Sequence, residues 1–247
     1  MPKVSINILT KNRAELLQRA LASVLSQSFT DYDIVVVNDG STDNTAAVLS
    51  ELKVKSEKLK VNTHTISLGI TKSRQEALQV SAGEYIAILD DDDEWVDKDK
   101  LKKQVEYLDS HPEVVLVGGG IEIEKREKRK EKRLRPQIDR AIRSTMLFRN
   151  NFFTSTVMFR RQLAAKVGGF MEDETDLAED YDLWLRLVRI GRAYNFQEVF
   201  TNYKQPEYTK EKLKQFYTKQ LHLIGRYKKD YKFYHLAATI AKLRILL

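Results

Sequence analysis

The chain has 247 residues, a formal net charge of +7 at pH 7 and no cysteine. This length fits one sizeable α/β domain with a modest appendage, and an apolar fraction of 42% excludes a disordered chain. The absence of cysteine excludes disulfides, thiolate zinc sites and cysteine nucleophiles. The N-terminus shows no signal-peptide pattern, and no apolar run approaches the roughly 20 residues of a membrane span. We therefore expect a cytoplasmic protein.

Strand and helix patterns alternate regularly from the N-terminus to Leu89. Apolar runs predict strands at residues 4–9, 33–37, 61–66 and 84–89, and stripes of apolar residues predict helices ending near Leu25, Leu52 and Ser81. Asn12 and Glu15 have the spacing of a capping box before the first helix, and Gly83 stands where a left-handed residue could end the third. This order predicts a Rossmann-like, mainly parallel sheet with right-handed crossovers and helices on both faces.

The second half of the chain alternates less regularly. The patterns predict helices at 97–110, 138–148, 161–167 and 177–190, and strands at 114–124, 153–159 and 193–200. From Glu211 the pattern is helical. We expect a catalytic domain over residues 1–205 and a helical C-terminal extension over 206–247.

Polar clusters follow three of the predicted strands, at residues 10–12, 39–43 and 90–93. In a parallel sheet, ligands bind outside the carboxyl ends of the strands, so these clusters indicate one site. The last cluster is a run of four aspartates, Asp90 to Asp93, whose carboxylates have an ordinary pKa of about 4 and repel one another when crowded. A divalent cation relieves that repulsion, and oxygen ligands favour Mg²⁺ or Mn²⁺. The alternative is a solvated turn in which Asp93 or Asp97 only caps the next helix.

Four blocks of sequence occur in a characteristic order: VSI to TKNR at 4–13, IVVVNDGSTD at 34–43, GEYI to LDDDD at 83–93, and EDYDLWLR at 179–186. Together they resemble family-2 glycosyltransferases, which are inverting, nucleotide-sugar-dependent enzymes with the GT-A fold. The resemblance spans about residues 4–203. Ser67 and Gln75 depart from it, because asparagines are common at those positions in the family.

The resemblance implies roles for individual residues. Asp39 would accept a hydrogen bond from the nucleobase, usually uracil, and Asp92 would bind Mn²⁺ or Mg²⁺ with support from Asp90. The other residues that it places at the nucleotide are Thr10, Asn12, Arg74 and Asp91. For three of these residues, a structural role without ligand binding is the alternative: Asp39 as a turn residue, Asn12 as a helix cap and Arg74 as a surface arginine.

Asp180 matches the position of the catalytic base in the resembled family, and Glu179 is the fallback. The implied reaction is a single displacement that moves a sugar, a hexose or an N-acetylhexosamine, from a nucleotide diphosphate, most commonly a UDP-sugar. The acceptor would be a hydroxyl of a glycan or glycolipid in polysaccharide biosynthesis.

Two other functions compete with this interpretation. One is transfer to a polyprenyl phosphate at the membrane surface. The other is a basic nucleotide- or nucleic-acid-binding module without catalysis, which we disfavour because the basic run 125–135 has no aromatic platforms for bases. We expect no nucleic-acid partner.

The basic run and the C-terminal leucines define two surfaces whose role the sequence leaves open. The run at 125–135 is a solvated hairpin or loop, or else a contact with a phosphate-bearing acceptor or with anionic lipid at the inner face of the membrane. The residues Leu236, Ile240, Leu243, Leu246 and Leu247 form an interfacial helix, or a helix that packs on its own domain or on a second subunit of a homodimer.

Overall fold

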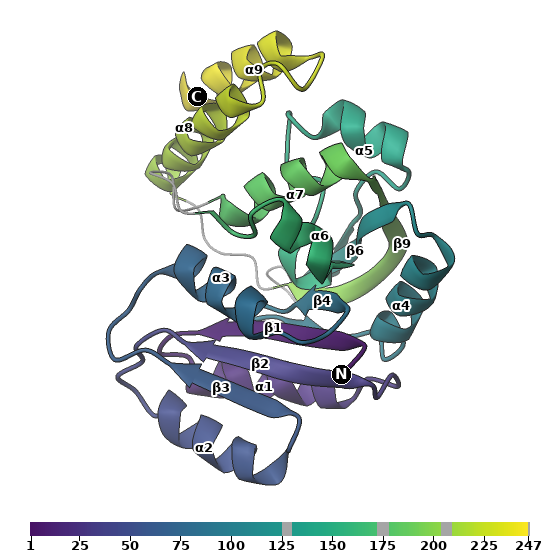
Figure 1. Ribbon diagram of the computed structural model, residues 1–247. Coiled ribbons are helices and arrows are strands. Elements are labelled where there is room, and N and C mark those ends of the chain that lie inside the picture. Colours follow the sequence, from purple (N-terminus) through teal and green to yellow (C-terminus); the bar gives the residue numbers. More distant parts are fainter. Residues whose placement is uncertain (125–129, 172–177, 204–208, 247) are drawn as a thin grey trace.

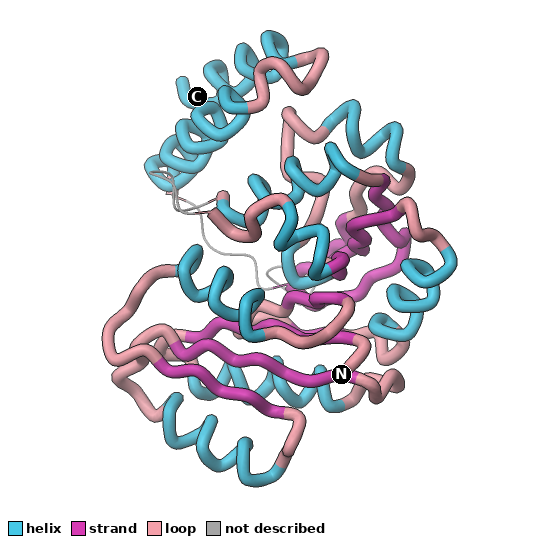
Figure 2. Tube along the Cα trace, viewed as in Figure 1, coloured by secondary structure: helices cyan, strands magenta, loops and turns pink. Residues whose placement is uncertain are grey.

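The structure is a computed structural model that describes residues 1–124, 130–171, 178–203 and 209–246 (Figure 1). Its core is one curved sheet with the strand order β3-β2-β1-β4-β8-β6-β9-β5, and β7 pairs with β6 at the side. Helices cover both faces of this sheet (Figure 2). The predicted α/β architecture is therefore confirmed. No described helix is long and apolar enough to cross a membrane.

The N-terminal half is the predicted parallel sheet. Its strands are β1 (Val4–Thr10), β2 (Tyr32–Asn38), β3 (Leu59–Thr63) and β4 (Tyr85–Ile88), and the three pairs among them are all parallel. The crossovers are α1 (Ala14–Leu25), α2 (Thr45–Lys55) and α3 (Ile70–Val80). Because β1, β2 and β3 step one way across the sheet and β4 returns to the other side of β1, right-handed crossovers place α3 on the face opposite α1 and α2 (Figure 1).

The C-terminal half of the sheet is mixed rather than mainly parallel. β8 (Met158–Arg160) runs antiparallel to both β4 and β6 (Val114–Glu124), whereas β9 (Arg192–Tyr203) runs parallel to β6. β5 (Glu94–Trp95) and β7 (Lys130–Arg133) are antiparallel to β9 and β6. Short antiparallel strands need no crossover helix, so the alternation that predicted the first half is lost here.

Six further helices complete the described structure: α4 (Lys100–Ser110), α5 (Asp139–Thr145), α6 (Arg161–Lys166), α7 (Glu179–Ile190), α8 (Lys210–Arg226) and α9 (Tyr234–Leu246). α7 packs through its fully buried Trp184 into a core shared with Phe159, and Leu223 and Ala237 of the C-terminal helices belong to the same core. α8 and α9 form a pair above α7 (Figure 1). The expected boundary at residue 205 lies outside the described residues.

Several local predictions were wrong. Asn12 does not cap α1, whose N-cap residue is Arg13. The N-cap residue of α4 is Asp99, and not Asp93 or Asp97. The third strand ends at Thr63, and the predicted strand 153–159 is instead a 3-10 turn, Thr154–Thr156, followed by β8. The short strand β5 was not predicted, because two residues carry no periodicity.

Gly83 was also misassigned, since it lacks the positive φ of a left-handed cap residue. Its role is close approach: a Cβ at this position would lie 2.4 Å from the backbone nitrogen of Ser5 and 2.7 Å from the carbonyl carbon of Val4. Only glycine allows the chain entering β4 to pass so near β1.

We predict that Gly83→Ala lowers the free energy of unfolding by about 1–3 kcal/mol, because the added methyl group meets the rigid backbone of a central strand. Gly225→Ala is the matched control. Gly225 lies in the last turn of α8, where the nearest heavy atom to an added Cβ is the Tyr234 hydroxyl at 4.0 Å, so that variant should be neutral or up to about 1 kcal/mol more stable. Urea unfolding measures both, and equal stability of the two variants would contradict the close-approach role.

Candidate functional site

The three predicted polar clusters meet at the carboxyl edge of the parallel sheet. β1 and β2 end side by side, and the Asp39 amide donates to the Thr10 carbonyl at 2.9 Å. Thr10 is buried at the end of β1, beside the carboxylate of Asp91. Asn12, with a φ of +55°, accepts hydrogen bonds from the Thr42 and Asp43 amides at 2.7 and 3.3 Å. Asn12 therefore fixes the loop after β2 and takes no part in capping α1.

Asp39 has both carboxylate oxygens occupied by neighbouring donors. Its Oδ1 accepts from the Leu68 amide at 2.7 Å and lies 2.8 Å from His64 Nδ1, and its Oδ2 accepts from the Ser67 hydroxyl at 2.6 Å and the Gly69 amide at 3.1 Å. Burial opposes ionisation of this carboxyl, but these hydrogen bonds lower its pKa below the ordinary value. Asp39 is therefore a fixed negative charge that organises the loop before α3.

His64 was missed by the sequence analysis. Its Nε2 lies 2.5 Å from Glu76 on α3, so the ring bridges two carboxylates. Burial works against its charge, yet hydrogen bonds to Asp39 and Glu76 raise the pKa of His64 above the ordinary value. No spacing in the sequence links these three residues. The link exists because β3 and α3 fold back beside the end of β2.

The four aspartates after β4 have different environments. Asp91 and Asp93 are buried, and Asp93 accepts a 2.5 Å hydrogen bond from the Ser155 hydroxyl. The side chains of Asp90 and Asp92 are 33% and 29% exposed, so these two are the carboxylates that a ligand could reach. Partly exposed and buried carboxylates therefore alternate along the run from Asp90 to Asp93.

Arg13 is a second residue that the sequence analysis did not assign to the site. Its Nη1 lies 2.7 Å from Asp91 Oδ1 and 3.0 Å from Asp92 Oδ2. Burial raises the pKa of Asp91, and the Arg13 guanidinium opposes that rise. The signal was available, because Arg13 directly follows Asn12 in the first sequence block.

Arg74 lies at the centre of the site. This buried guanidinium donates through Nε to Glu179 Oε1 and through Nη2 to Asp90 Oδ1, both at 2.9 Å. It therefore joins the end of β4 to the first turn of α7. The interpretation of Arg74 as a surface arginine is wrong, because its exposed fraction is only 6%.

Glu179 and Asp180 differ sharply although they are adjacent. Glu179 is buried, which raises the pKa of its carboxyl, an effect that Arg74 opposes. Asp180 is partly exposed, and its Oδ2 accepts a short hydrogen bond from the Thr154 hydroxyl. Asn150 lies 3.5 Å from the same oxygen. Of the two residues, only Asp180 is accessible to solvent in part.

Among the described residues, no three histidine or acidic side chains converge as a ready-made metal cage. Mg²⁺ is usually held by one or two carboxylates together with substrate phosphates and water, and such a site needs no cage. Asp90 and Asp92 offer two accessible carboxylates of that kind. The residues present therefore fit a cation that binds together with a diphosphate.

Comparison with known proteins identifies the family. The sequence profile of glycosyl transferase family 2 matches residues 5–168, which stops short of Glu179 and Asp180. Among curated relatives, an uncharacterized glycosyltransferase of Haemophilus influenzae is 26% identical over 82% of this chain, and the amylovoran biosynthesis glycosyltransferase AmsE of Erwinia amylovora is 29% identical over 77%. The chain spans 65% and 71% of the lengths of these two relatives.

Solved structures agree with this assignment at the level of the fold. The mannosyltransferase PcManGT of Pyrobaculum calidifontis, solved with GDP-Man and Mn²⁺, superposes with a TM-score of 0.73 over 98% of this chain and 74% of its own, at 20% identity. S. aureus TarS 1-349, solved with UDP-GlcNAc, gives a TM-score of 0.70 over 98% and 70%, at 19% identity. The expected GT-A fold is confirmed, and with two thirds of its length matched by the family profile, the chain belongs to glycosyl transferase family 2.

Proposed function

We propose that the protein is an inverting glycosyltransferase that moves a sugar from a nucleoside diphosphate-sugar to a hydroxyl of a glycan or glycolipid. The single observation that best supports this function is the Arg74 bridge. The bridge brings the accessible carboxylate of Asp90, which suits a diphosphate-bound cation, close to Glu179 and its neighbour Asp180, the candidate base. Family membership supports the same class of reaction.

For the donor, we propose a UDP-sugar whose base is bound at Asp39. All four acceptor positions of Asp39 are engaged, so one donor must give way to a base N–H group. The Ser67 hydroxyl suits this exchange, because it can rotate without moving the backbone, whereas the two amides cannot. Thr10, Asn12 and Asp91 complete the proposed nucleotide side. TarS was solved with UDP-GlcNAc and PcManGT with GDP-Man, so a donor panel must include both nucleotides.

For the cation, we propose that Asp92 is the main protein ligand and that Asp90 supports it. When bound, Mn²⁺ or Mg²⁺ supplies a positive charge that stabilises the leaving diphosphate. Arg13 now holds one oxygen of Asp92, and Arg74 holds one oxygen of Asp90. Each carboxylate therefore keeps a second oxygen for a ligand, while the guanidinium groups fix its orientation.

For the acceptor, we propose Asp180 as the general base. The acceptor hydroxyl loses its proton to Asp180 as its oxygen attacks the anomeric carbon, and the bond from that carbon to the diphosphate oxygen breaks with its electron pair leaving on the nucleotide. A base must reach the proton that it removes, and Asp180 is the accessible carboxylate. The Thr154 hydroxyl and Asn150 amide orient it. Glu179 is a poorer candidate, because it is buried against Arg74.

A polyprenyl phosphate acceptor is the alternative for the same site. The exposed leucines of α9 are the observation that favours a lipid-linked acceptor. The two acceptor classes are separated by supplying the protein with a polyprenyl phosphate in detergent or with a soluble glycan, and following release of nucleotide from the donor.

Asp180→Asn should lower the rate of nucleotide release by about 10²–10⁴-fold, because the amide cannot accept the proton, while the dissociation constant of UDP stays unchanged. The rate is measured with Mn²⁺ and a panel of UDP- and GDP-sugars, and UDP binding by calorimetry. Asp31→Asn, an exposed residue on the loop before β2, is the matched control and should behave as wild type. A wild-type rate in Asp180→Asn would rule out the proposed base.

Chelation of divalent cations should abolish nucleotide release, and added Mn²⁺ should restore it. In Asp92→Asn, restoration should require at least about tenfold more Mn²⁺, because one charged ligand is lost. Asp97→Asn, just beyond the acidic run, serves as the control. Identical Mn²⁺ titrations for wild type and Asp92→Asn would show that Asp92 is not a ligand.

Arg74→Met should lower the free energy of unfolding by about 3–5 kcal/mol, since it leaves the buried carboxylate of Glu179 unpaired. Arg19→Met removes an arginine of similar size from an exposed ion pair with Glu94, and should cost about 1 kcal/mol or less. Urea unfolding followed by circular dichroism compares the two. Equal effects would mean that the Arg74 bridge is no stronger than a surface pair.

A further inference from the structure

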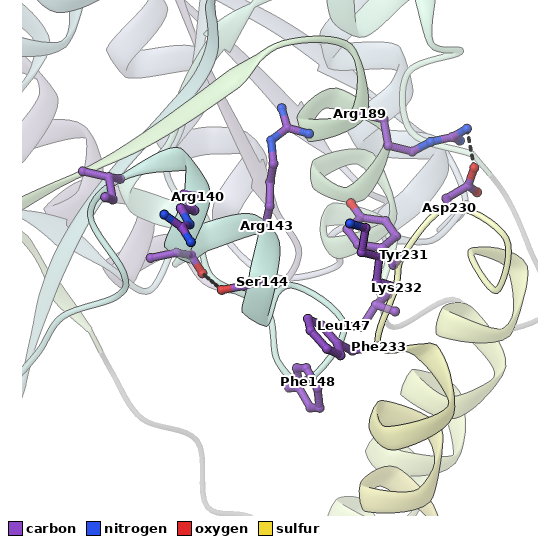
Figure 3. A pocket seen from close by; sticks show the side chains of 12 residues that line it. Arg140, Arg143, Ser144, Leu147, Phe148, Arg189, Asp230, Tyr231, Lys232 and Phe233 are labelled. Carbon is purple, nitrogen blue, oxygen red and sulfur yellow. Dashed lines mark hydrogen bonds and ion pairs between the residues drawn. The ribbon is translucent and has the colours of Figure 1, made fainter.

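A concave site lies away from the strand ends. It is a cleft of about 870 Å³ between α5, the C-terminal end of α7 and the loop from α8 to α9 (Figure 3). Four cationic side chains line it, namely Arg140, Arg143, Arg189 and Lys232, against one acidic side chain, Asp230. Leu147, Phe148 and Phe233 lie below the charged groups in Figure 3 and give the cleft an apolar floor.

The four cations are not equally engaged. Arg143 is 2.8 Å from Asp139 and donates to the Gly191 carbonyl at 2.6 Å, and Arg189 is 2.7 Å from Asp230. In the described part of the chain, Arg140 and Lys232 have no ion-pair partner, and both are exposed. Lys228 and Lys229 extend the exposed positive charge along the same loop. The cleft therefore has a surplus of positive charge available to an anion.

An apolar stripe continues from the edge of this cleft along α9. Phe233 and Leu236 are 54% and 55% exposed, and Leu243 is 55% exposed on the same helical face. The opposite face of α9 packs inward with Ala237, Ala238 and Ala241. This is the reverse of an ordinary surface helix, whose large apolar residues face the core. The outward leucines thus form an apolar surface that water does not favour.

We propose that this cleft and the outer face of α9 together form a docking surface for an anionic lipid membrane. Head-group phosphates bind between Arg140 and Lys232, and Phe233 and Leu236 enter the boundary between head groups and acyl chains. Cations beside exposed aromatic and leucine side chains are the composition of a surface that lies on a membrane without crossing it.

The apolar half of the surface distinguishes lipid from the other anionic partners. Nucleic acid would use the cations and aromatic rings, but aliphatic leucines along α9 offer no stacking face to a base. A free phosphate ion would contact the cations but not the apolar stripe. A lipid surface uses both the cations and the apolar stripe, because it presents negative charge above a hydrocarbon layer.

The docking surface and the proposed transfer site occupy opposite ends of α7. Asp180 is in its first turn and Arg189 in its last, so the rise of the helix over these nine residues separates their backbones by about 14 Å. Docking would therefore hold the transfer site near the membrane without covering it. The proposal does not rest on the proposed transfer, since lipid binding can be measured without a donor.

The test is co-sedimentation with vesicles. Wild type should pellet with phosphatidylcholine vesicles that contain about one third phosphatidylglycerol, and stay in solution with pure phosphatidylcholine. Arg140→Gln/Lys232→Gln should bind the anionic vesicles about 20- to 30-fold more weakly, since each cation near such a surface strengthens binding about fivefold. Lys228→Gln/Lys229→Gln on the exposed loop should weaken binding similarly, and Phe233→Ser/Leu236→Ser should weaken it at high salt as well as low.

The control variants remove positive charge or exposed apolar area elsewhere on the molecule. Lys53→Gln/Lys102→Gln removes two exposed lysines from α2 and α4, and Val54→Ser removes a residue that is 89% exposed. Both should pellet as wild type does. Equal loss in the lysine control, equal binding to neutral vesicles, or no vesicle binding at all would overturn the proposal. So would a cleft-dependent dimer in sedimentation velocity or cleft-dependent oligonucleotide binding without binding to vesicles.

Discussion

Arg74 places one positive charge between two carboxylates that the chain supplies from distant segments. Glu179 is 105 residues away in sequence and Asp90 is 16 residues away, yet both lie 2.9 Å from the same guanidinium. A buried charge without partners is costly, so the guanidinium and its two carboxylates must be brought together for the structure to be stable. The end of β4 and the start of α7 are thereby held in one arrangement, and the positions of Asp90 and Asp180 follow from it.

The other acidic side chains of the site are also held by hydrogen bonds or ion pairs within the protein. Arg13 holds Asp91 and Asp92, the Ser155 hydroxyl holds Asp93, and His64 lies between Asp39 and Glu76. Carboxylates crowded at one sheet edge would otherwise repel one another. Pairing holds these side chains in fixed positions, which lowers the reorganisation that a nucleotide diphosphate and its cation would demand.

α7 connects the candidate site and the basic cleft through the core of the molecule. Its buried face carries Trp184 against Phe159, and the Tyr227 hydroxyl of the C-terminal segment donates to Asp182 at 2.5 Å. The first turn of α7 presents Asp180 at the sheet edge, and the last turn presents Arg189 in the basic cleft. The α8–α9 pair packs on this helix and carries the outward leucines, so the proposed transfer site and the proposed docking surface share one rigid element.

The sequence by itself determined the parallel half of the sheet, because its apolar runs alternate regularly with helical segments. Parallel strands need such a crossover helix between them. It also determined the family and the sheet edge where Asp39, Asp90 and Asp92 gather, because these residues directly follow strands. Tertiary structure alone decided that His64 lies between Asp39 and Glu76 and that Arg74 reaches Glu179. It also decided that Asn12 fixes the loop after β2 and that Gly83 allows close approach of the chain to β1. These contacts join residues that no local periodicity relates, and their energies depend on burial, which exists only once the chain is packed.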